Sequence, residues 1–429
     1  MSDDGQFVCH GCGARVDAAL SLPFRCPNAD DGRDIDHLLL PVDADAVGID
    51  TASDDPFVRY RRFLSPYRLA RRAGLSDEVW TEIAGRLDAA LIAADGTGFR
   101  LTPLREQARL AQAIGFSGRL WVKDETGNVA GSHKARHLMG VMLYLLVLEA
   151  ARLPAGDALS SRRLAIASCG NAALAAAVIA RAAEWPLDVF IPPDASPSVV
   201  RRLTELGATI TLCERRAGER GDPCFLRFRE AVAAGAIPFG VQGTENGLAI
   251  EGGRTLALEM AETFAATGAQ PGSLYVQIGG GALASGLAQG FALAARQDLV
   301  PAVPRLMAVQ TAACAPLARA WAQLSSGDPK SAAQRRSQFM WAWENAPSSV
   351  ASGILDDETY DWFEIVSAMR ASGGAPVVAV ETVLQRAHEV GVATTGIRAS
   401  ATGTAGLAGL IAAPPASGDA VIIFSGIER

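Results

Sequence analysis

The chain has 429 residues, which at about 100–200 residues per domain suggests two or three domains. Apolar residues make up 49 % and charged residues 20 %, an ordinary balance that excludes a disordered chain. The formal net charge of −7 argues against nucleic acid or an anionic membrane as the main partner.

The same composition gives no sign of export or of a membrane anchor. The longest apolar stretch, residues 138–148, is too short for the ~20 residues that a bilayer requires. The first residues, Met-Ser-Asp-Asp-Gly, are acidic and have no apolar core, so we expect no signal peptide. The 7 cysteines are an odd number, and four are scattered through apolar or mixed segments. These features favour a cytoplasmic protein with reduced thiols.

Residues 1–40 differ from the rest of the chain because they hold three cysteines and two histidines. Cys9 and Cys12 form a Cys-x-x-Cys pair, and with Cys26 and His37 they offer four possible zinc ligands. A usual zinc ribbon would close with a second Cys-x-x-Cys, which is missing after Cys26. A metal-free docking segment therefore remains the alternative for this N-terminal knuckle.

Residues 41–100 are expected to be a linker followed by a helical extension. Residues 41–57 are acidic and poor in large apolar groups. A helix is predicted at 76–94, where Ser76 can cap the first turn.

Residues 101–425 alternate short apolar runs with longer helical patterns, as expected of buried parallel sheets. Strands are predicted at residues 119–122, 163–168, 187–191, 208–213, 274–278, 305–310, 377–380 and 420–424. Helices are predicted at residues 133–151, 171–184, 198–206, 223–234, 248–266, 282–295, 382–390 and 404–412. These strands are too many for one small sheet, so we expect two open α/β domains with a cleft between them. The smaller one should be a subdomain at about 132–245, inserted in the larger.

Only three of the 39 basic residues are lysines, namely Lys123, Lys134 and Lys330. Arginine cannot form an imine, so a chain that has replaced most lysines can still retain one where an amine is needed. Lys134 follows Gly-Ser where a helix begins, and a helix N-terminus disfavours a second positive charge. An imine-forming lysine at 134 and an ordinary surface lysine are both compatible with this context.

Three further strand ends carry loops of unusual composition, where open α/β sheets bind ligands. The loop after residue 167 could hold a carboxylate on its backbone N–H groups, and consists of Ser168, Cys169, Gly170, Asn171 and Ala172. The loop after the strand at 274–278 suits a small phosphate-bearing cofactor, and consists of Gly279, Gly280, Gly281, Ala282 and Leu283. Thr402 precedes the last helix and could face a ring nitrogen. Each loop could also be an ordinary strand–helix turn.

Together the four loops resemble those of the fold-type II pyridoxal-phosphate (PLP) enzymes, in the same order along the chain. The segment from Gly131 to Arg136 resembles their Gly-Ser-Phe-Lys-x-Arg, which implies that Lys134 is the Schiff-base lysine. Residues 168–171 resemble their Ser-Ser/Thr-Gly-Asn, which implies that this loop binds the substrate carboxylate and that Asn171 contacts the cofactor. Residues 279–283 resemble the phosphate loop, and Thr402 resembles the residue that faces the pyridine nitrogen.

Within that family the chain is most similar to threonine synthase-like members, through its N-terminal extension, Thr102-Pro103-Leu104 and residues 349–354. Residues 192–197 resemble the family's ammonia-lyases instead. The sequence departs from the family's pattern at five positions, which are His133 for Phe, Ala135 for Asp, His137 for a small residue, Cys169 for a hydroxyl residue and Ala282 for a glycine. At a helix N-terminus, the Cys169 thiol should have a lowered pKa, while a bound carboxylate would raise it.

The resemblance implies a PLP-dependent lyase that abstracts the α-proton of an amino acid and eliminates a β- or γ-substituent. Ammonia-lyase or dehydratase chemistry and threonine synthase-like replacement share these residues. The resemblance also implies a homodimer. The alternatives are a catalytically silent PLP-binding protein whose knuckle binds a partner, and a metal-dependent enzyme using His133 and His137.

Overall fold

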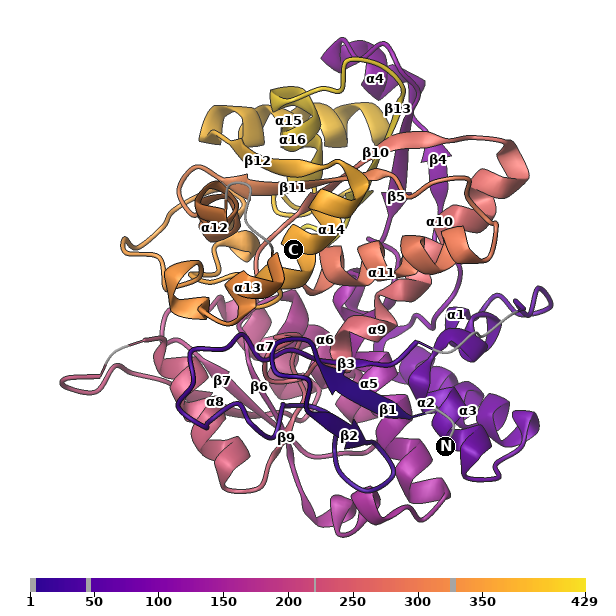
Figure 1. Ribbon diagram of the computed structural model, residues 1–429, viewed down its shortest axis with the longest axis vertical. Helices are drawn as coiled ribbons and strands as arrows, with labels where there is room; N and C mark the ends of the chain where they lie inside the picture. The colour runs from indigo at the N-terminus through magenta and orange to yellow at the C-terminus, as the bar shows by residue number, and fades with distance from the viewer. Residues whose placement is uncertain (1–4, 44–47, 220, 325–328) are drawn as a thin grey trace. The chain divides into compact units, whose positions relative to one another are not determined.

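The computed structural model describes residues 5–43, 48–219, 221–324 and 329–429 (Figure 1). The acidic residues at the very start of the chain lie outside these ranges. The chain divides into two compact units, described here one at a time. The first comprises Met1–Pro27, Leu38–Arg100 and Asn128–Gly252, and the second comprises Asn28–His37, Leu101–Gly127 and Gly253–Arg429.

The first unit is built on a four-stranded parallel sheet with the order β8-β7-β6-β9. Its strands are β6 Leu164–Ala167, β7 Leu187–Ile191, β8 Thr209–Leu212 and β9 Ile237–Pro238. Its helices are α1 Pro56–Arg59, α2 Ser65–Arg72, α3 Asp77–Asp95, α5 Lys134–Ala150, α6 Asn171–Ala182, α7 Pro197–Glu205, α8 Pro223–Ala233 and α9 Ala249–Gly252. The four residues of β6 are all buried, as expected for a strand covered on both faces.

Helix α5 is buried on nearly all sides, which explains its almost continuous apolar sequence. Its first turn lies against the end of α9, because a Cβ added at Gly252 would be only 2.0 Å from the Arg136 carbonyl oxygen. Only glycine fits that contact.

A small antiparallel sheet with the order β2-β1-β3 precedes the helices of the first unit. Its strands are β1 Gln6–Cys9, β2 Arg15–Asp17 and β3 Leu39–Pro41. Sequence analysis did not predict these strands, since each has only three or four residues and none shows a clear alternation.

The second unit has a six-stranded sheet with the order β12-β11-β10-β13-β5-β4. All neighbouring pairs are parallel except β4 with β5. Its strands are β4 Leu104–Glu106, β5 Leu120–Asp124, β10 Pro271–Gln277, β11 Arg305–Thr311, β12 Ala375–Ala379 and β13 Asp419–Phe424. Its helices are α4 Ala108–Ile114, α10 Arg254–Thr267, α11 Ala282–Arg296, α12 Pro316–Leu324, α13 Pro329–Ala333, α14 Trp362–Ser372, α15 Glu381–Thr395 and α16 Ala405–Ala412.

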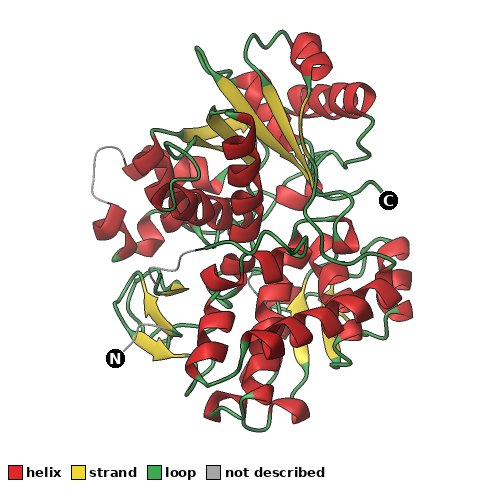
Figure 2. Cartoon of the chain, turned by 90° about the vertical axis from the view of Figure 1, so that its right-hand side faces the viewer, coloured by secondary structure: helices red, strands yellow, loops and turns green. Residues whose placement is uncertain are grey.

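The expectation of two open α/β domains with parallel-type sheets is confirmed, and Figure 2 shows helices beside the strands of both larger sheets. The eight predicted strands agree with the structure to within three residues at each end. The helix predicted at 248–266 is in fact two helices, because the helical hydrogen bonding is interrupted at Gly253. Within the described parts of the chain, every helix is too short or too polar to qualify as a bilayer-spanning segment.

Candidate active site

In the first unit, a strained turn places Lys134 at the start of α5. Ala130 has a positive φ of 54°, and its N–H donates to the Asp95 carboxylate at 2.7 Å. Gly131 follows with φ 68°. A non-glycine residue in this conformation costs energy and persists only where its surroundings hold it, a situation common at functional sites. Lys134 itself is half-buried.

Two buried histidines flank Lys134 in sequence, one directly before it and one a helical turn after it. The rings of His133 and His137 meet edge to face, with centroids 5.7 Å apart. His137 Nδ1 lies 2.8 Å from the Ala249 carbonyl oxygen and therefore carries the proton. Burial, with the neighbouring charge of Lys134, lowers the pKa of His137 to about 3 and that of His133 well below its usual value. Both imidazoles are therefore neutral at pH 7.

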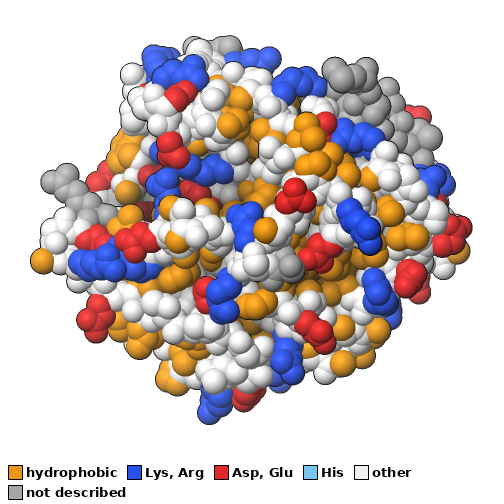
Figure 3. All heavy atoms as spheres, turned by 90° about the horizontal axis from the view of Figure 1, so that it is seen from below, with side chains coloured by type: hydrophobic (Ala, Val, Ile, Leu, Met, Phe, Trp, Pro, Cys, Tyr) orange, Lys and Arg blue, Asp and Glu red, His pale blue; other side chains and the backbone are white. Residues whose placement is uncertain are grey.

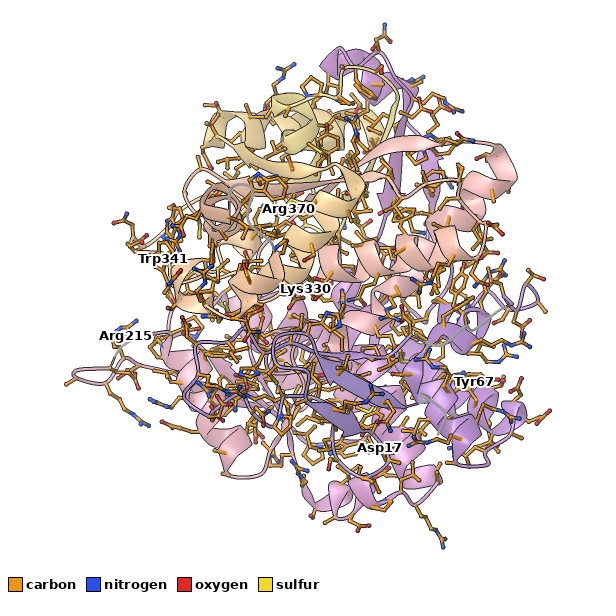
Figure 4. The ribbon with its side chains drawn as sticks, in the orientation of Figure 1. Asp17, Tyr67, Arg215, Lys330, Trp341 and Arg370 are labelled. Atoms are coloured by element: carbon orange, nitrogen blue, oxygen red, sulfur yellow. The ribbon has the colours of Figure 1, made fainter. Side chains whose placement is uncertain are left out.

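Lys123, the other candidate for an imine, is held in a buried ion pair in the second unit. Its Nζ donates to Glu259 Oε2 at 2.5 Å and to the Thr102 carbonyl oxygen at 2.6 Å. Lys123 and Glu259 are only 1 % and 3 % exposed at the side chain. To bond a cofactor, the Lys123 amine would have to leave both oxygen partners. Lys330 is exposed on α13 (Figure 4).

The predicted carboxylate loop connects β6 to α6 in the first unit. Gly170 caps the helix, so that Asn171 is the first helical residue and not the cap. The Gly170 N–H donates to Ser168 Oγ at 3.4 Å. Helix α6 packs against α5 and against the turn Val129–Gly131, so α6 and the turn before Lys134 lie in one region of this unit. The 12-residue helix presents backbone N–H groups where a carboxylate could bind.

Cys169 is exposed in this loop, but its thiol pKa is raised, which makes the expected lowering wrong. The surrounding protein desolvates the thiolate, and the carboxylates of Asp194 and Asp222 oppose it further. These effects outweigh the backbone hydrogen bond that favours the thiolate.

In the second unit, the three-glycine loop joins β10 to α11, and a side chain at any of the three glycines would crowd its neighbours. A Cβ at Gly279 would lie 2.2 Å from the Asp356 carboxylate, and one at Gly280 would lie 2.8 Å from the Tyr360 ring. Gly281 caps α11 with φ 113°. Thr359 Oγ1 donates to the Gly279 carbonyl oxygen at 3.2 Å, which fixes the loop.

This loop fits a phosphate group in three respects and opposes it in one. Glycines allow close approach, and the 15-residue helix α11 supplies the positive end of its dipole. In the first turn of α11, Ser285 Oγ is buried and makes no hydrogen bond within the described residues. The Asp356 carboxylate beside Gly279 opposes an anion. Sequence analysis did not single out Ser285 or Asp356, since neither belongs to a recognisable motif.

Thr402 is linked to the glycine loop by the segment 353–356, which contacts both of them. Its Oγ1 accepts a hydrogen bond from the Gly353 N–H at 3.0 Å, while Ile354 and Asp356 contact Gly279. Because the Thr402 oxygen accepts, its own hydrogen can be donated to another acceptor, such as a ring nitrogen. The Thr402 loop is also held at its next residue, where a Cβ at Gly403 would be 2.0 Å from the Ser425 carbonyl oxygen.

The four predicted zinc ligands come together at the N-terminal sheet. The sulfur atoms of Cys9, Cys12 and Cys26 and one imidazole nitrogen of His37 all lie within 4.8 Å of one another.

Two α/β units of this topology, with these loops at their strand ends, define the class of fold-type II pyridoxal-phosphate enzymes. Residues 96–426 match the family model described as "Pyridoxal-phosphate dependent enzyme", and the chain belongs to that family. Its cofactor is pyridoxal phosphate.

Curated relatives and solved structures agree with this assignment. The chain is 31 % identical to the mouse (Mus musculus) "Serine dehydratase-like" protein over 192 residues, 44 % of this chain and 52 % of the relative. It is 26 % identical to the mouse "L-serine dehydratase/L-threonine deaminase" over 189 residues, with the same coverage. The chain thus spans about half the length of the curated relatives it matches.

Solved structures extend the likeness in fold over most of the chain. Maize serine racemase superposes with a TM-score of 0.59 and 19 % identity, covering 81 % of this chain and 93 % of that one. Diaminopropionate ammonia lyase from Escherichia coli gives 0.58 and 17 %, covering 82 % and 89 %. These identities support the shared fold alone.

Proposed function

We propose that the protein is a PLP-dependent lyase that eliminates a β-substituent, and then ammonia, from a small amino acid such as serine or threonine. The observation that carries the proposal is the position of Lys134 at the start of α5. Lys134 is half-buried and follows the left-handed residues Ala130 and Gly131, and α6, which begins at the predicted carboxylate loop, packs against the same turn. Lys123 instead lies in the second unit, in a buried ion pair with Glu259.

PLP, when bound, withdraws electrons from the α-carbon of an attached amino acid, so that the α-proton can be removed and a β-substituent can leave. Lys134 Nζ is proposed to form the covalent bond to the cofactor in the resting enzyme. Once substrate has displaced it, the free Nζ would take the α-proton as a general base. The neutral imidazoles of His133 and His137 add no positive charge that would compete with proton uptake.

The remaining predicted residues would bind and orient the substrate and the cofactor. Backbone N–H groups at residues 168–172 would hold the substrate carboxylate, and the Asn171 amide would contact the cofactor. The glycine loop at 279–283, with Ser285, would hold the phosphate. Thr402 would donate its hydroxyl hydrogen to the ring nitrogen, which leaves that nitrogen without a proton of its own and disfavours transamination.

The proposed substrate comes from the names of the curated relatives, which match this chain over about half of their own length. The names "Serine dehydratase-like" and "L-serine dehydratase/L-threonine deaminase" both point to loss of a β-hydroxyl group. Replacement of the leaving group by another nucleophile, as in threonine synthase, is the alternative reaction, since it needs the same residues.

The test is a panel of L-serine, L-threonine and L-2,3-diaminopropionate with PLP-loaded protein, in which keto acid and ammonia are both measured. We expect keto acid from at least one substrate, with one ammonia per keto acid from L-serine or L-threonine and two from L-2,3-diaminopropionate, and neither product with Lys134→Ala. Formation of the D-enantiomer without keto acid would indicate a racemase. A bound cofactor with no turnover of any kind would indicate a silent PLP-binding protein.

A further inference from the structure

The N-terminal sheet contains a compact group of metal-binding side chains that the PLP chemistry does not use. Cys9 is the last residue of β1 and Cys12 lies in the turn that leads to β2, where the Gly13 N–H donates to the Cys9 carbonyl oxygen at 2.8 Å. Gly13 has φ 74°, a conformation that suits glycine in so tight a turn. The turn therefore presents both thiols of the Cys-x-x-Cys pair on one side of a fixed loop.

The third thiol comes from a separate part of the same unit. Cys26 Sγ lies 3.5 Å from Cys12 Sγ, although 14 residues separate them in the chain. Cys9 and Cys26 are 1 % and 3 % exposed. Two thiol sulfurs at this separation are too far apart for a disulfide, whose bond is about 2.05 Å.

The position of His37 follows from chain connectivity, because the next residue, Leu38, belongs to the first unit. The Leu38 carbonyl oxygen accepts from the His10 N–H at 2.9 Å, and the next residue, Leu39, pairs with Cys9 in the sheet. These contacts fix His37 locally, next to the turn that carries Cys9 and Cys12.

The dimensions and the chemistry of the group both favour zinc. Zinc bonds of about 2.1–2.3 Å put tetrahedral ligands roughly 3.4–3.8 Å apart. The four ligand atoms lie within 4.8 Å of one another, so a closure of about 1 Å would complete the geometry. Thiolates and imidazole select zinc over magnesium or calcium, which prefer oxygen.

Backbone groups around Cys9 support the same ligand role. The N–H groups of Gly11 and Cys12 are directed at the Cys9 sulfur. Such N–H···S contacts orient a ligating thiolate and share its negative charge.

We propose that Cys9, Cys12, Cys26 and His37 bind one structural zinc ion, which fixes the β1–β2 turn to the segments that carry Cys26 and His37. Four protein ligands leave no open position, as in structural rather than catalytic zinc sites. A three-stranded sheet of this size buries little core of its own, so a metal would add stability that packing cannot supply. The missing second Cys-x-x-Cys is replaced by a single cysteine and a histidine.

The test is the metal content of the full-length, PLP-loaded protein, purified without chelator and analysed by plasma mass spectrometry. We expect about one zinc per chain, and its loss in Cys9→Ser/Cys12→Ser. Cys213→Ser is the matched control, because Cys213 is a buried cysteine of the first unit outside the group. The PLP absorbance band is read on the same samples, so that failure of the zinc site and failure of the proposed enzyme remain distinguishable.

Thiol chemistry on the wild-type protein keeps the test independent of whether the double variant folds. A mercurial reagent should release zinc in step with thiol modification. In a separate sample that has not been treated with the mercurial, all 7 thiols should be titratable after denaturation. Zinc content near zero would overturn the proposal, and so would iron in place of zinc. Only 5 titratable thiols under non-reducing conditions, that is 7 − 2, would indicate a disulfide instead.

Discussion

Lys123 Nζ lies 2.5 Å from Glu259 Oε2 in the interior of the second unit. Removing one member of such a pair leaves a buried charge without its partner, which costs about 3–5 kcal/mol. Lys123→Met should therefore lower the free energy of unfolding by that order, as measured by denaturant titration. Lys123→Met/Glu259→Gln should recover part of the loss. If either variant folds but loses its borohydride-sensitive cofactor band, the assignment of Lys123 as structural is wrong.

Asp356 sits beside Gly279, where its negative charge opposes a phosphate group. Asp356→Asn should tighten PLP binding by roughly 3–10-fold, the effect of removing one partly screened like charge. The measurement is a fluorescence titration of apoprotein. Pyridoxal, which lacks the phosphate, is the control ligand and should bind both proteins equally. Weaker PLP binding, or an equal change for both ligands, would show that the carboxylate has another role.

Cys169 has a raised thiol pKa, so alkylation at pH 7 should be slow and should accelerate as the pH rises above the ordinary range of a cysteine. Bound substrate should slow it further. Cys169→Ser should keep the cofactor band and change the KM for the amino acid, since a hydroxyl is the stronger hydrogen-bonding group. Unchanged kinetics across the substrate panel, with labelling insensitive to substrate, would place the thiol outside the carboxylate site.

His137 makes stability depend on pH in a predictable direction. Its folded pKa of about 3 is below the unfolded value near 6.5, so the unfolded chain binds the extra proton as the pH falls. His137 therefore costs stability below pH 6.5, by about 1.4 kcal/mol per pH unit until the folded pKa is reached.

His137→Asn should lack this penalty, so its stability relative to the wild type should improve steadily from pH 6.5 to pH 5. The difference between the two proteins is the quantity to measure, because Asp36, with a pKa raised to about 6, acts in the opposite sense in both. A constant difference over this range would mean that His137 is protonated in the folded protein.

The strands of the two larger sheets could be predicted because their apolar runs report burial directly, as in the fully buried Leu164–Ala167. The short strand Leu104–Glu106 could not, since an edge strand with charged residues leaves no such pattern. The position of Gly170 as cap of α6 also required coordinates, because asparagine is the more usual capping residue.

In the candidate site, too, some features could be predicted from the sequence and others could not. The lysine and glycine motifs are contiguous in sequence and could be recognised there. The Lys123–Glu259 pair joins residues 136 positions apart, and Asp356 reaches Gly279 from a segment 77 positions later, by 356 − 279. Contacts of that kind follow from the tertiary fold, which no local pattern specifies.

The central claim is that Lys134 bonds the cofactor, and borohydride reduction followed by peptide mapping tests it most directly. Reduction makes the bond between PLP and the lysine permanent, so mass spectrometry can locate it. We predict that the label lies on Lys134 in the wild type and in Lys330→Ala, and that Lys134→Ala carries none. A label on Lys123, or a wild-type protein that binds PLP without any reducible bond, would contradict the account.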